Sequence, residues 1–273
     1  MSMPHAYRIG QRLLTIEHIS LAYEQPLLRD VSASIDNIVR ARMHQGQVVC
    51  VLGPPGIGKT QLLRCIAGLQ APLSGNIFLH DQRKAVAPGD IGVVAQHCPL
   101  LDHRTVLGNL LLAEPTACRQ RAYKKVLAML LEFGLADQAQ SYPQELNTEQ
   151  RLLVAIAQQL LHGSHFLLID EPFLGLDPQA KSTVCAAILK VSRFYELNTI
   201  LVVTRDIMAA TRIADTLWLL GRERDAHGRP IPGAKIKYHY DLIERGIAWQ
   251  QDFEYTPDFF ALCEELQQRF RDL

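Results

Sequence analysis

Short apolar runs separated by polar turns predict a series of β-strands along this chain. In chain order they cover residues 13–23, 31–35, 48–52, 76–80, 90–95, 165–169, 199–203 and 216–220. The runs 48–52, 165–169 and 199–203 are almost entirely apolar, which is typical of strands buried on both faces of a parallel sheet.

Apolar residues at three- and four-residue spacing predict helices between these strands. The helical patterns comprise Leu62, Leu63, Ile66 and Leu69, and residues 123–133, 150–161, 181–195 and 259–270. Strands that alternate with helices indicate right-handed crossovers and an α/β fold with a mostly parallel sheet.

Two segments carry no such pattern. Residues 36–45 give no clear expectation, whereas residues 222–235 are polar and rich in glycine and proline, which predicts a loop or linker. The predicted organisation is an α/β core formed by residues 1–96 and 161–225, a helical subdomain at 97–160, and a C-terminal extension at 226–273.

Composition narrows the class of protein. The 273 residues are 48% hydrophobic and include 28 Lys and Arg against 28 Asp and Glu, so a sizeable core is expected and nucleic acid is not the favoured partner. The N-terminus lacks the apolar region of a signal peptide and no apolar run is long enough to span a bilayer, so we expect a soluble, cytosolic chain. The six cysteines form no C-x-x-C pair and are expected to be reduced core residues.

The segment after the run 48–52 carries the strongest candidate chemistry. Residues 53–60 read GPPGIGKT, which fits the Walker A pattern between a strand and a helix. Its glycines, which let backbone N–H groups wrap a triphosphate, are Gly53, Gly56 and Gly58. Lys59 would reach the β- and γ-phosphates, and the Thr60 hydroxyl would bind Mg²⁺. An ordinary glycine turn is the alternative, and Pro55 departs from the expected chemistry because it has no N–H to donate.

Two carboxylates end the apolar run at 165–169. Asp170 and Glu171 follow it directly, which is the Walker B arrangement. Asp170 would hold Mg²⁺ through its water shell, and Glu171 would polarise the attacking water. An Asp-Glu pair at a strand end is common on protein surfaces, and only the preceding P-loop favours the catalytic interpretation.

With these motifs in this order, residues 13–220 resemble the ATP-binding subunit of an ABC transporter, most closely the importer ATPases for nitrate, sulfonate and taurine. The resemblance implies a P-loop NTPase core with a mostly parallel sheet, an antiparallel β subdomain and an inserted α-helical subdomain. It also implies ATP and Mg²⁺ as cofactors.

The resemblance assigns further roles to single residues. Tyr23 resembles the aromatic residue that stacks on adenine, although its position in the pattern alone favours a core side chain. Gln96 is similar to the glutamine that contacts magnesium and the attacking water and leads to the permease contact. Asp177 matches the residue that meets the opposite protomer.

The segment before the helical pattern 150–161 departs from the family. Where relatives carry Leu-Ser-Gly-Gly-Gln, a loop that grips the nucleotide of the other protomer, this chain carries Leu146, Asn147, Thr148, Glu149 and Gln150. Asn147 can still cap the helix, with Gln150 completing a capping box. Glu149 places a carboxylate near a phosphate, which would attenuate the function. Alternatively, Glu149 turns outward and complements the helix dipole.

Two further positions differ from the family. Arg205 occupies the place of a histidine that contacts the γ-phosphate. Because arginine stays charged, it can contact phosphate but cannot exchange a proton there, which predicts slower hydrolysis. Gln61 replaces a hydroxyl residue that is usual after Thr60, which is a smaller loss.

These residues lead to one principal function and two alternatives. The principal one is an ATP-hydrolysing subunit that dimerises and drives a separate membrane permease, an importer of a small anionic or organic solute supplied by a substrate-binding protein. Such a subunit lies in the cytoplasm, peripheral on the inner face of the cell membrane. The first alternative is an ATP-binding regulatory or scaffold subunit with weak hydrolysis. The second is an ABC-type ATPase acting on nucleic acid or ribosomes, which the neutral charge and the single cassette disfavour.

Overall fold

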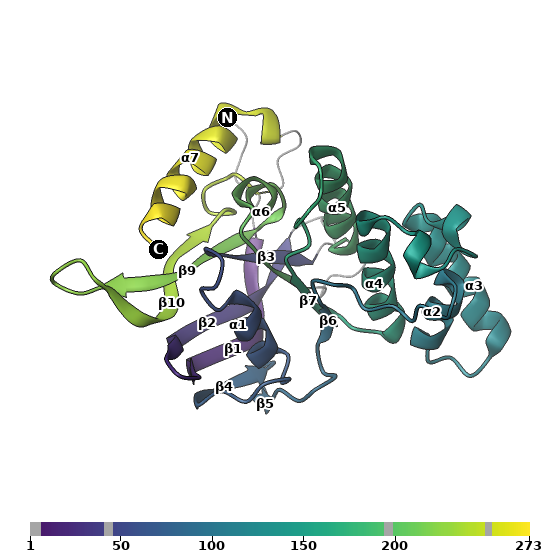
Figure 1. Cartoon of the computed structure of the whole chain (residues 1–273), viewed down its shortest axis with the longest axis horizontal. Coiled ribbons are helices and arrows are strands. Elements are labelled where there is room, and N and C mark those ends of the chain that lie inside the picture. Colours follow the sequence, from purple (N-terminus) through teal and green to yellow (C-terminus); the bar gives the residue numbers. More distant parts are fainter. Residues whose placement is uncertain (1–6, 41–45, 194–198, 249–252) are drawn as a thin grey trace.

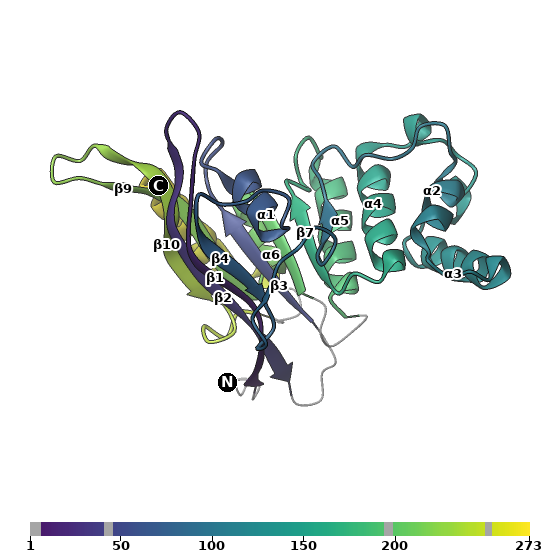
Figure 2. The same cartoon turned by 90° about the horizontal axis from the view of Figure 1, so that it is seen from below.

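The computed structural model describes residues 7–40, 46–193, 199–248 and 253–273 (Figure 1). Its strands form one ten-stranded sheet in the order β5-β4-β1-β2-β10-β9-β3-β8-β7-β6. The sheet is mixed, and helices lie on its faces and beyond one edge (Figure 2).

The central part of the sheet is parallel. It consists of β3 (Gln47–Leu52), β6 (Gly92–Val94), β7 (Phe166–Asp170), β8 (Thr199–Thr204) and β9 (Thr216–Arg224). Along β3, Val48, Cys50 and Leu52 pack into one core cluster, and Val49 and Val51 pack into a second cluster on the opposite face. Burial on both faces explains why this strand is apolar throughout.

The other part of the sheet is antiparallel. It contains β1 (Tyr7–Ala22), β2 (Pro26–Arg40), β4 (Ser74–Leu79) and β5 (Lys84–Ala85). The strand β10 (Pro230–Asp241) joins the two parts, because it pairs with β9 along its length and with β2 at Ala234. The predicted α/β class, with an antiparallel part beside a parallel core, is confirmed.

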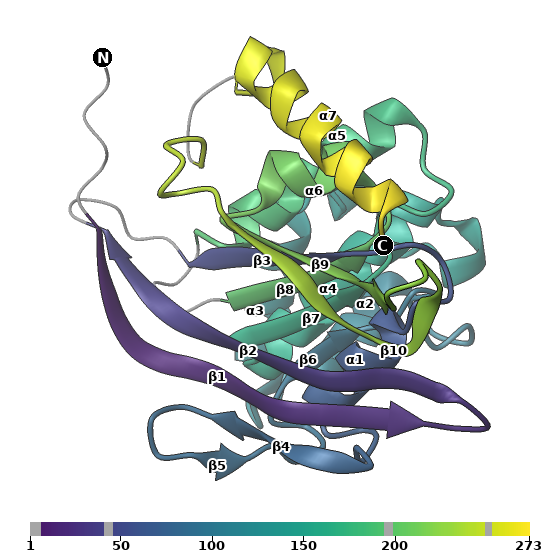
Figure 3. The ribbon, with the colours of Figure 1, turned by 90° about the vertical axis from the view of Figure 1, so that its left-hand side faces the viewer.

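Helices cover the sheet in two groups (Figure 3). The helices α5 (Pro178–Val191), α6 (Ile207–Ile213) and α7 (Pro257–Arg271) pack on one face, and the short helix η3 (Phe253–Tyr255) precedes α7. The helix α1 (Lys59–Ile66) packs on the other face, between the parallel strands and the antiparallel part.

A separate cluster holds the helical segment beyond the β6 edge of the sheet (Figure 2). It comprises α2 (Val106–Ala113), α3 (Arg119–Glu132), α4 (Thr148–His162) and the short helices η1 (Ala136–Gln138) and η2 (Pro143–Glu145). The helix α4 also contributes Leu152, Ala155 and Ile156 to the sheet's core, so it connects the two clusters.

The structure corrects several sequence predictions. The segment 222–235 is not a loop, because β9 continues to Arg224 and β10 starts at Pro230, with these two residues paired. Leu69 lies beyond the end of α1 and is 51% exposed, because the helix stops at Ile66. Strand β2 is longer than predicted and includes residues 36–40, while residues 41–45 lie outside the described part.

Smaller differences concern one helix and the cysteines. The helix predicted at 181–195 starts earlier, with Asp177 as its N-cap, and ends at Val191; residues 194–198 lie outside the described part. All six cysteines are free, and Cys118 is exposed rather than in the core. Within the described ranges, no helix is long and apolar enough to cross a membrane.

Candidate nucleotide site

The glycine loop lies between the end of β3 and the start of α1. Gly56 has φ 74° and Gly58 has φ 109°, a left-handed conformation that only glycine adopts at little cost. A Cβ on Gly53 would lie 2.8 Å from the Leu220 carbonyl oxygen. The path of the loop therefore favours glycine at these three positions.

Lys59 folds back over this loop. Its Nζ donates hydrogen bonds to the carbonyl oxygens of Gly53 at 2.8 Å and Pro54 at 3.2 Å, and it lies 3.2 Å from Glu171 Oε1. The side chain is almost fully buried, and these three oxygen atoms are its polar contacts within the protein. A triphosphate in the loop would take over from these acceptors.

The carboxylates at the end of β7 face the same loop. Asp170 Oδ1 accepts a hydrogen bond from Thr60 Oγ1 at 3.1 Å. Burial raises the pKa of Asp170, and the Thr60 hydroxyl opposes this shift. A hydroxyl and a buried carboxylate in contact are hard oxygen donors of the kind that Mg²⁺ prefers, so these residues fit that ion.

Glu171 is held in position by the neighbouring strand β8. It has φ 46°, an uncommon conformation for a residue with a side chain, and its N–H donates to the Val203 carbonyl oxygen at 2.8 Å. Its Oε2 accepts hydrogen bonds from Thr204 Oγ1 and from the Arg205 N–H, both at 3.2 Å. The carboxylate is thereby fixed between Lys59 and the end of β8.

A cavity of about 410 Å³ lies beside the glycine loop; Gly53 and Asp170 are not among the described residues that line it. Predicted site residues in its lining are Gly56, Gly58, Lys59, Thr60, Gln61, Gln96, Glu171 and Arg205. Leu27, in β2, and Leu174, in the turn after β7, also line it, and sequence reasoning missed both because a single apolar residue carries no distinctive signal of a binding site. Leu27 is nonetheless close, because a Cβ on Gly58 would lie 3.2 Å from its Cγ.

Tyr23 lies beside this cavity and not in the core. Its ring is 63% exposed, so the interpretation as a core side chain is wrong. The Tyr23 hydroxyl donates to Gln61 Oε1 at 3.2 Å and accepts from Gln70 Nε2 at 2.7 Å. An exposed ring tethered to the residue that follows Thr60 is available to stack on a base.

The altered segment at the start of α4 forms the predicted capping box. Asn147 Oδ1 accepts from the Gln150 N–H at 2.8 Å, and Gln150 Oε1 accepts from the Asn147 N–H at 3.0 Å. Neither these two residues nor Thr148, Glu149 and Asp177 are among the described residues that line the cavity. One chain therefore does not bring them to its own phosphate loop.

Glu149 faces the beginning of α5. Burial raises its pKa, the charge of Asp177 raises it further, and a hydrogen bond with Thr183 opposes both effects. Asp177 itself caps α5 by accepting from the Ala180 N–H at 2.9 Å. Glu149 is half-buried against its own chain instead of pointing freely into solvent.

Arg205, the last of the predicted site residues, follows the end of β8. Asp206 caps α6 and also pairs with Lys181, with 2.6 Å between Nζ and Oδ2. This pairing fixes the turn on which the exposed Arg205 side chain borders the cavity.

Together, the glycine loop after β3, the carboxylate pair after β7 and the helical cluster between β6 and β7 define a P-loop nucleotide-binding protein with a helical insertion. The chain belongs to the ABC transporter family, since residues 37–174 match the model of that family, described as ABC transporter. The relatives that it matches are ATP-binding proteins.

Several import proteins are similar to the chain. The methionine import ATP-binding protein MetN of Carboxydothermus hydrogenoformans is 32% identical over 78% of this chain and 64% of its own length. The glutamine transport ATP-binding protein GlnQ of Geobacillus stearothermophilus is 33% identical over 72% of this chain and 82% of its own length. The aliphatic sulfonates import ATP-binding protein SsuB 1 of Burkholderia lata is 34% identical over 72% and 60%. The chain thus spans less than two thirds of MetN and SsuB 1.

Solved structures share the fold. The cbiO1 protein of Clostridium perfringens, part of the ABC transporter complex cbiONQ, aligns with a TM-score of 0.68 at 22% identity over 88% of this chain and 92% of its own. The ATP-binding cassette MJ0796, in a dimeric post-hydrolysis state bound to ADP and Pi, aligns with a TM-score of 0.65 at 22% identity over 84% and 99%.

Proposed function

We propose that this chain binds and hydrolyses ATP as the energy-coupling subunit of an ABC importer. Two such chains, or this chain and a second ATPase, close around ATP and reopen after hydrolysis, and this motion drives a separate integral-membrane permease. The transported solute is small and anionic or organic, and a substrate-binding protein delivers it. Three relatives, named for methionine import, glutamine transport and aliphatic sulfonate import, support an importer.

The observation that supports hydrolysis best is the position of Glu171. Its carboxylate lies 3.2 Å from Lys59 Nζ and borders the same cavity as the phosphate loop. A general base must reach a water beside the γ-phosphate that Lys59 binds. Hydrogen bonds from Thr204 and the Arg205 N–H hold the carboxylate in place.

Other residues at or near the cavity bind magnesium and the phosphates. Thr60 and Gln96 supply oxygen ligands for Mg²⁺, and Asp170 holds the ion through its water shell. When bound, Mg²⁺ neutralises charge on the β- and γ-phosphates. Lys59 exchanges the carbonyls of the loop for phosphate oxygens. Arg205, at the end of β8, contacts the γ-phosphate.

Two groups of residues bind the parts of ATP that lie away from the reaction. Tyr23 stacks on adenine, and the hydrogen bond from the Tyr23 hydroxyl to Gln61 keeps the tyrosine ring in place. The segment Asn147, Thr148, Glu149 and Gln150 closes the site of the partner protomer, and Asp177 lies at the same interface. In the cell, the subunit sits in the cytoplasm, peripheral on the inner face of the membrane.

The first test replaces the proposed base. Glu171→Gln keeps the size of the side chain and one acceptor oxygen for Thr204 and the Arg205 N–H but removes its charge and basicity, so ATP binding should persist while steady-state hydrolysis falls at least about 100-fold. Binding of ATP with magnesium and release of phosphate are measured on the same preparation. Glu24→Gln, in the exposed turn after β1, is the matched control and should leave both unchanged.

A regulatory subunit with weak hydrolysis is the second candidate, favoured by the environment of Glu149. Glu149 occupies a position where relatives have glycine, and its carboxylate is packed beside Asp177. Arg205, in place of a histidine, cannot act as a proton carrier. If these two residues attenuate the enzyme, the double variant Glu149→Gly with Arg205→His should turn over ATP several times faster than the wild type.

The control for that experiment is Arg104→His, which changes an exposed arginine outside the cavity. An unchanged rate in the double variant, with ATP binding intact, would contradict the regulatory candidate. A wild-type rate equal to that of Glu171→Gln, despite ATP binding, would support it.

A further inference from the structure

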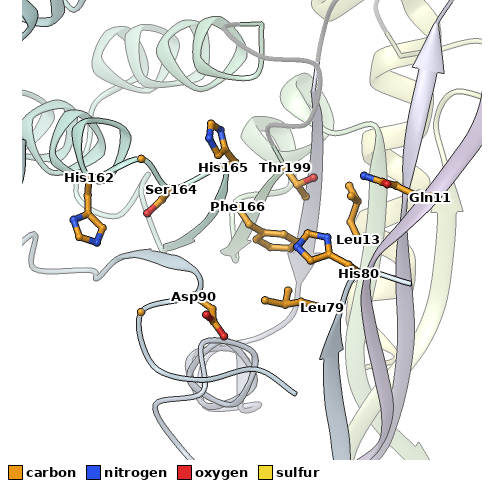
Figure 4. Close-up of a pocket in the computed structure, with 12 residues that line it drawn as sticks. Gln11, Leu13, Leu79, His80, Asp90, His162, Ser164, His165, Phe166 and Thr199 are labelled. Carbon is orange, nitrogen blue, oxygen red and sulfur yellow. The ribbon is translucent and has the colours of Figure 1, made fainter. Parts of the chain in front are cut away.

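A second cavity, of about 620 Å³, lies at the other end of the sheet from the nucleotide site (Figure 4). Phe166 begins β7 and Thr199 begins β8, and both line it. The opposite ends of the same two strands carry Asp170 and Thr204. The cavity is therefore separate from the phosphate loop by the length of these strands.

Four parts of the chain meet around this cavity. Gln11 and Leu13 come from β1, Leu79 and His80 from the end of β4, Gly89 and Asp90 from the loop before β6, and His162, Gly163, Ser164 and His165 from the end of α4 and the residues after it. A volume of this size, with an apolar wall and a few polar groups, is typical of a site for a small organic molecule.

The lining mixes apolar and polar side chains. In Figure 4, Phe166 and Leu79 lie near each other with Asp90 beside them, and His80 lies against Phe166. Thr199 is buried in the wall, and its hydroxyl has no hydrogen-bond partner among the described residues. A polar group of a ligand could form that hydrogen bond and remove the free-energy cost of an unsatisfied buried hydroxyl.

The charges favour a cation over an anion. No lysine or arginine is among the described residues that line the cavity. Its lining includes His80, His162 and His165, whose imidazole rings, when neutral, can accept a hydrogen bond from an ammonium group. The carbonyl end of α4 points to it at Gly163, the helix C-cap, and carries partial negative charge. The described residues contain no cluster of three or more side chains able to hold a metal ion, so an organic cation is the better match.

Asp90 is the group able to bind such a cation. Its carboxylate accepts hydrogen bonds from Lys84 Nζ at 2.6 Å and from the Ala87 N–H at 2.9 Å, and these interactions lower its pKa, so it is charged at neutral pH. Each carboxylate oxygen has a second lone pair. Lys84 is a weak competitor, because its side chain is 58% exposed and exposed ion pairs contribute little.

We propose that this cavity binds a small organic amine carrying an apolar ring, with the ring against Phe166 and Leu79 and the ammonium group toward Asp90 and the end of α4. The helix α4 runs from this cavity to Asn147 at the altered segment. An occupant would thus contact both the sheet and the helix that bears the partner-facing residues.

Tryptamine and indole-3-acetate test the proposal, because both contain the indole ring system and they carry opposite charges. Equilibrium dialysis of the full chain is done with saturating ADP and magnesium, which occupy the nucleotide site. Tryptamine should bind under these conditions and indole-3-acetate should not. Equal binding of the two compounds, loss of tryptamine binding when ADP is added, or no binding of tryptamine would overturn the proposal.

Two variants with opposite expected effects locate the ammonium group. Asp90→Asn should weaken tryptamine binding about tenfold, and Lys84→Gln should strengthen it about threefold by removing the competitor. Asp81→Asn, a carboxylate near the end of β4 that does not line the cavity, is the control and should bind as the wild type does. If Asp90→Asn is destabilised, Lys84→Gln still decides, since an unchanged affinity there contradicts the assigned position.

Discussion

Several charged residues in the candidate nucleotide site lie where they could interact with a charged ligand. Lys59 and Glu171 compensate each other at 3.2 Å, and Asp170 has a hydroxyl as its closest hydrogen-bond partner. Burial of Asp170 without a cation raises its pKa. The charged Asp170 carboxylate therefore destabilises the folded protein in the absence of nucleotide and magnesium, the ligands proposed to bind beside it.

This argument predicts a stability gain from Asp170→Asn in the nucleotide-free protein. Because the pKa is higher in the folded than in the unfolded state, the folded state binds the proton more tightly, and stability falls as the pH rises through the folded-state pKa. The amide carries no charge and still accepts from Thr60. Its melting temperature should exceed that of the wild type by a few degrees at pH 7–8.

The difference should shrink as the pH approaches the ordinary carboxyl range, near about 4. Thermal unfolding of both proteins between pH 4 and 8, without nucleotide, measures it. Asp102→Asn, an exposed carboxylate, should show no difference at any pH. A variant less stable than the wild type at pH 8 would mean that the carboxylate is stabilised by contacts that burial does not outweigh.

Residue types predicted much of the site. The glycines, Lys59, Thr60 and Glu171 follow from the spacing of two short motifs, because a phosphate loop accepts few alternatives at those positions. The position of Tyr23 did not follow, since alternation along a strand predicts a buried ring and the strand ends one residue earlier, at Ala22. Leu27 and Leu174 border the cavity only because the chain folds back there.

Among the elements, the C-terminal segment is part of the molecule's core. The helix α7 places Leu262 and Leu266 in the same cluster as β3 and β9, and Phe259 packs edge-on against Phe253 at a centroid distance of 5.4 Å. Leu273 lies against Gly221, where a Cβ would meet its side chain at 2.6 Å. The segment after Gly221 therefore stabilises the sheet and does not act as a linker.

Truncation of one core side chain on α7 tests this conclusion. Leu266→Ala removes a fully buried side chain and should lower the free energy of unfolding by about 2–5 kcal/mol, measured by urea denaturation. Gln267→Ala, one position further along and exposed, should change it by less than about 0.5 kcal/mol. Equal stability of the two variants would indicate that α7 detaches without cost.

The elements that the sequence missed have a common cause. The strands β9 and β10 continue through polar residues because they pair with each other, and this backbone pairing leaves no hydrophobic pattern. The same holds for β2 beyond Ile35, which pairs with β1 up to Arg40. The buried parallel strands were found because both of their faces must be apolar.

At the scale of the whole molecule, one chain does not complete the proposed site. The residues Asn147, Thr148, Glu149, Gln150 and Asp177 do not line the cavity that holds Lys59, within the described part of the chain. If they serve a partner's nucleotide, each site of a homodimer carries both Arg205 and the altered segment. With a second ATPase of ordinary sequence, each site would carry only one of these changes.

ATP should therefore control the oligomeric state when hydrolysis is blocked. Glu171→Gln retains ATP, so with ATP and magnesium it should elute as a dimer in size-exclusion chromatography with light scattering, and as a monomer without nucleotide. The double variant Glu171→Gln with Lys59→Ala lacks the phosphate-binding lysine and should stay monomeric. A protein that binds ATP but remains a monomer would favour a heterodimer with another subunit.

The sequence by itself determined the class of fold, the phosphate loop, the carboxylate pair and the capping box of α4, because each depends on residues close together in the chain. The tertiary structure decided which distant residues meet: the contact of Lys59 with Glu171, the exposed Tyr23, the hairpin of β9 and β10, and the cavity around Phe166. Such meetings arise from strand pairing, sheet order and helix packing, which depend on contacts between segments and leave no hydrophobic pattern in the local sequence.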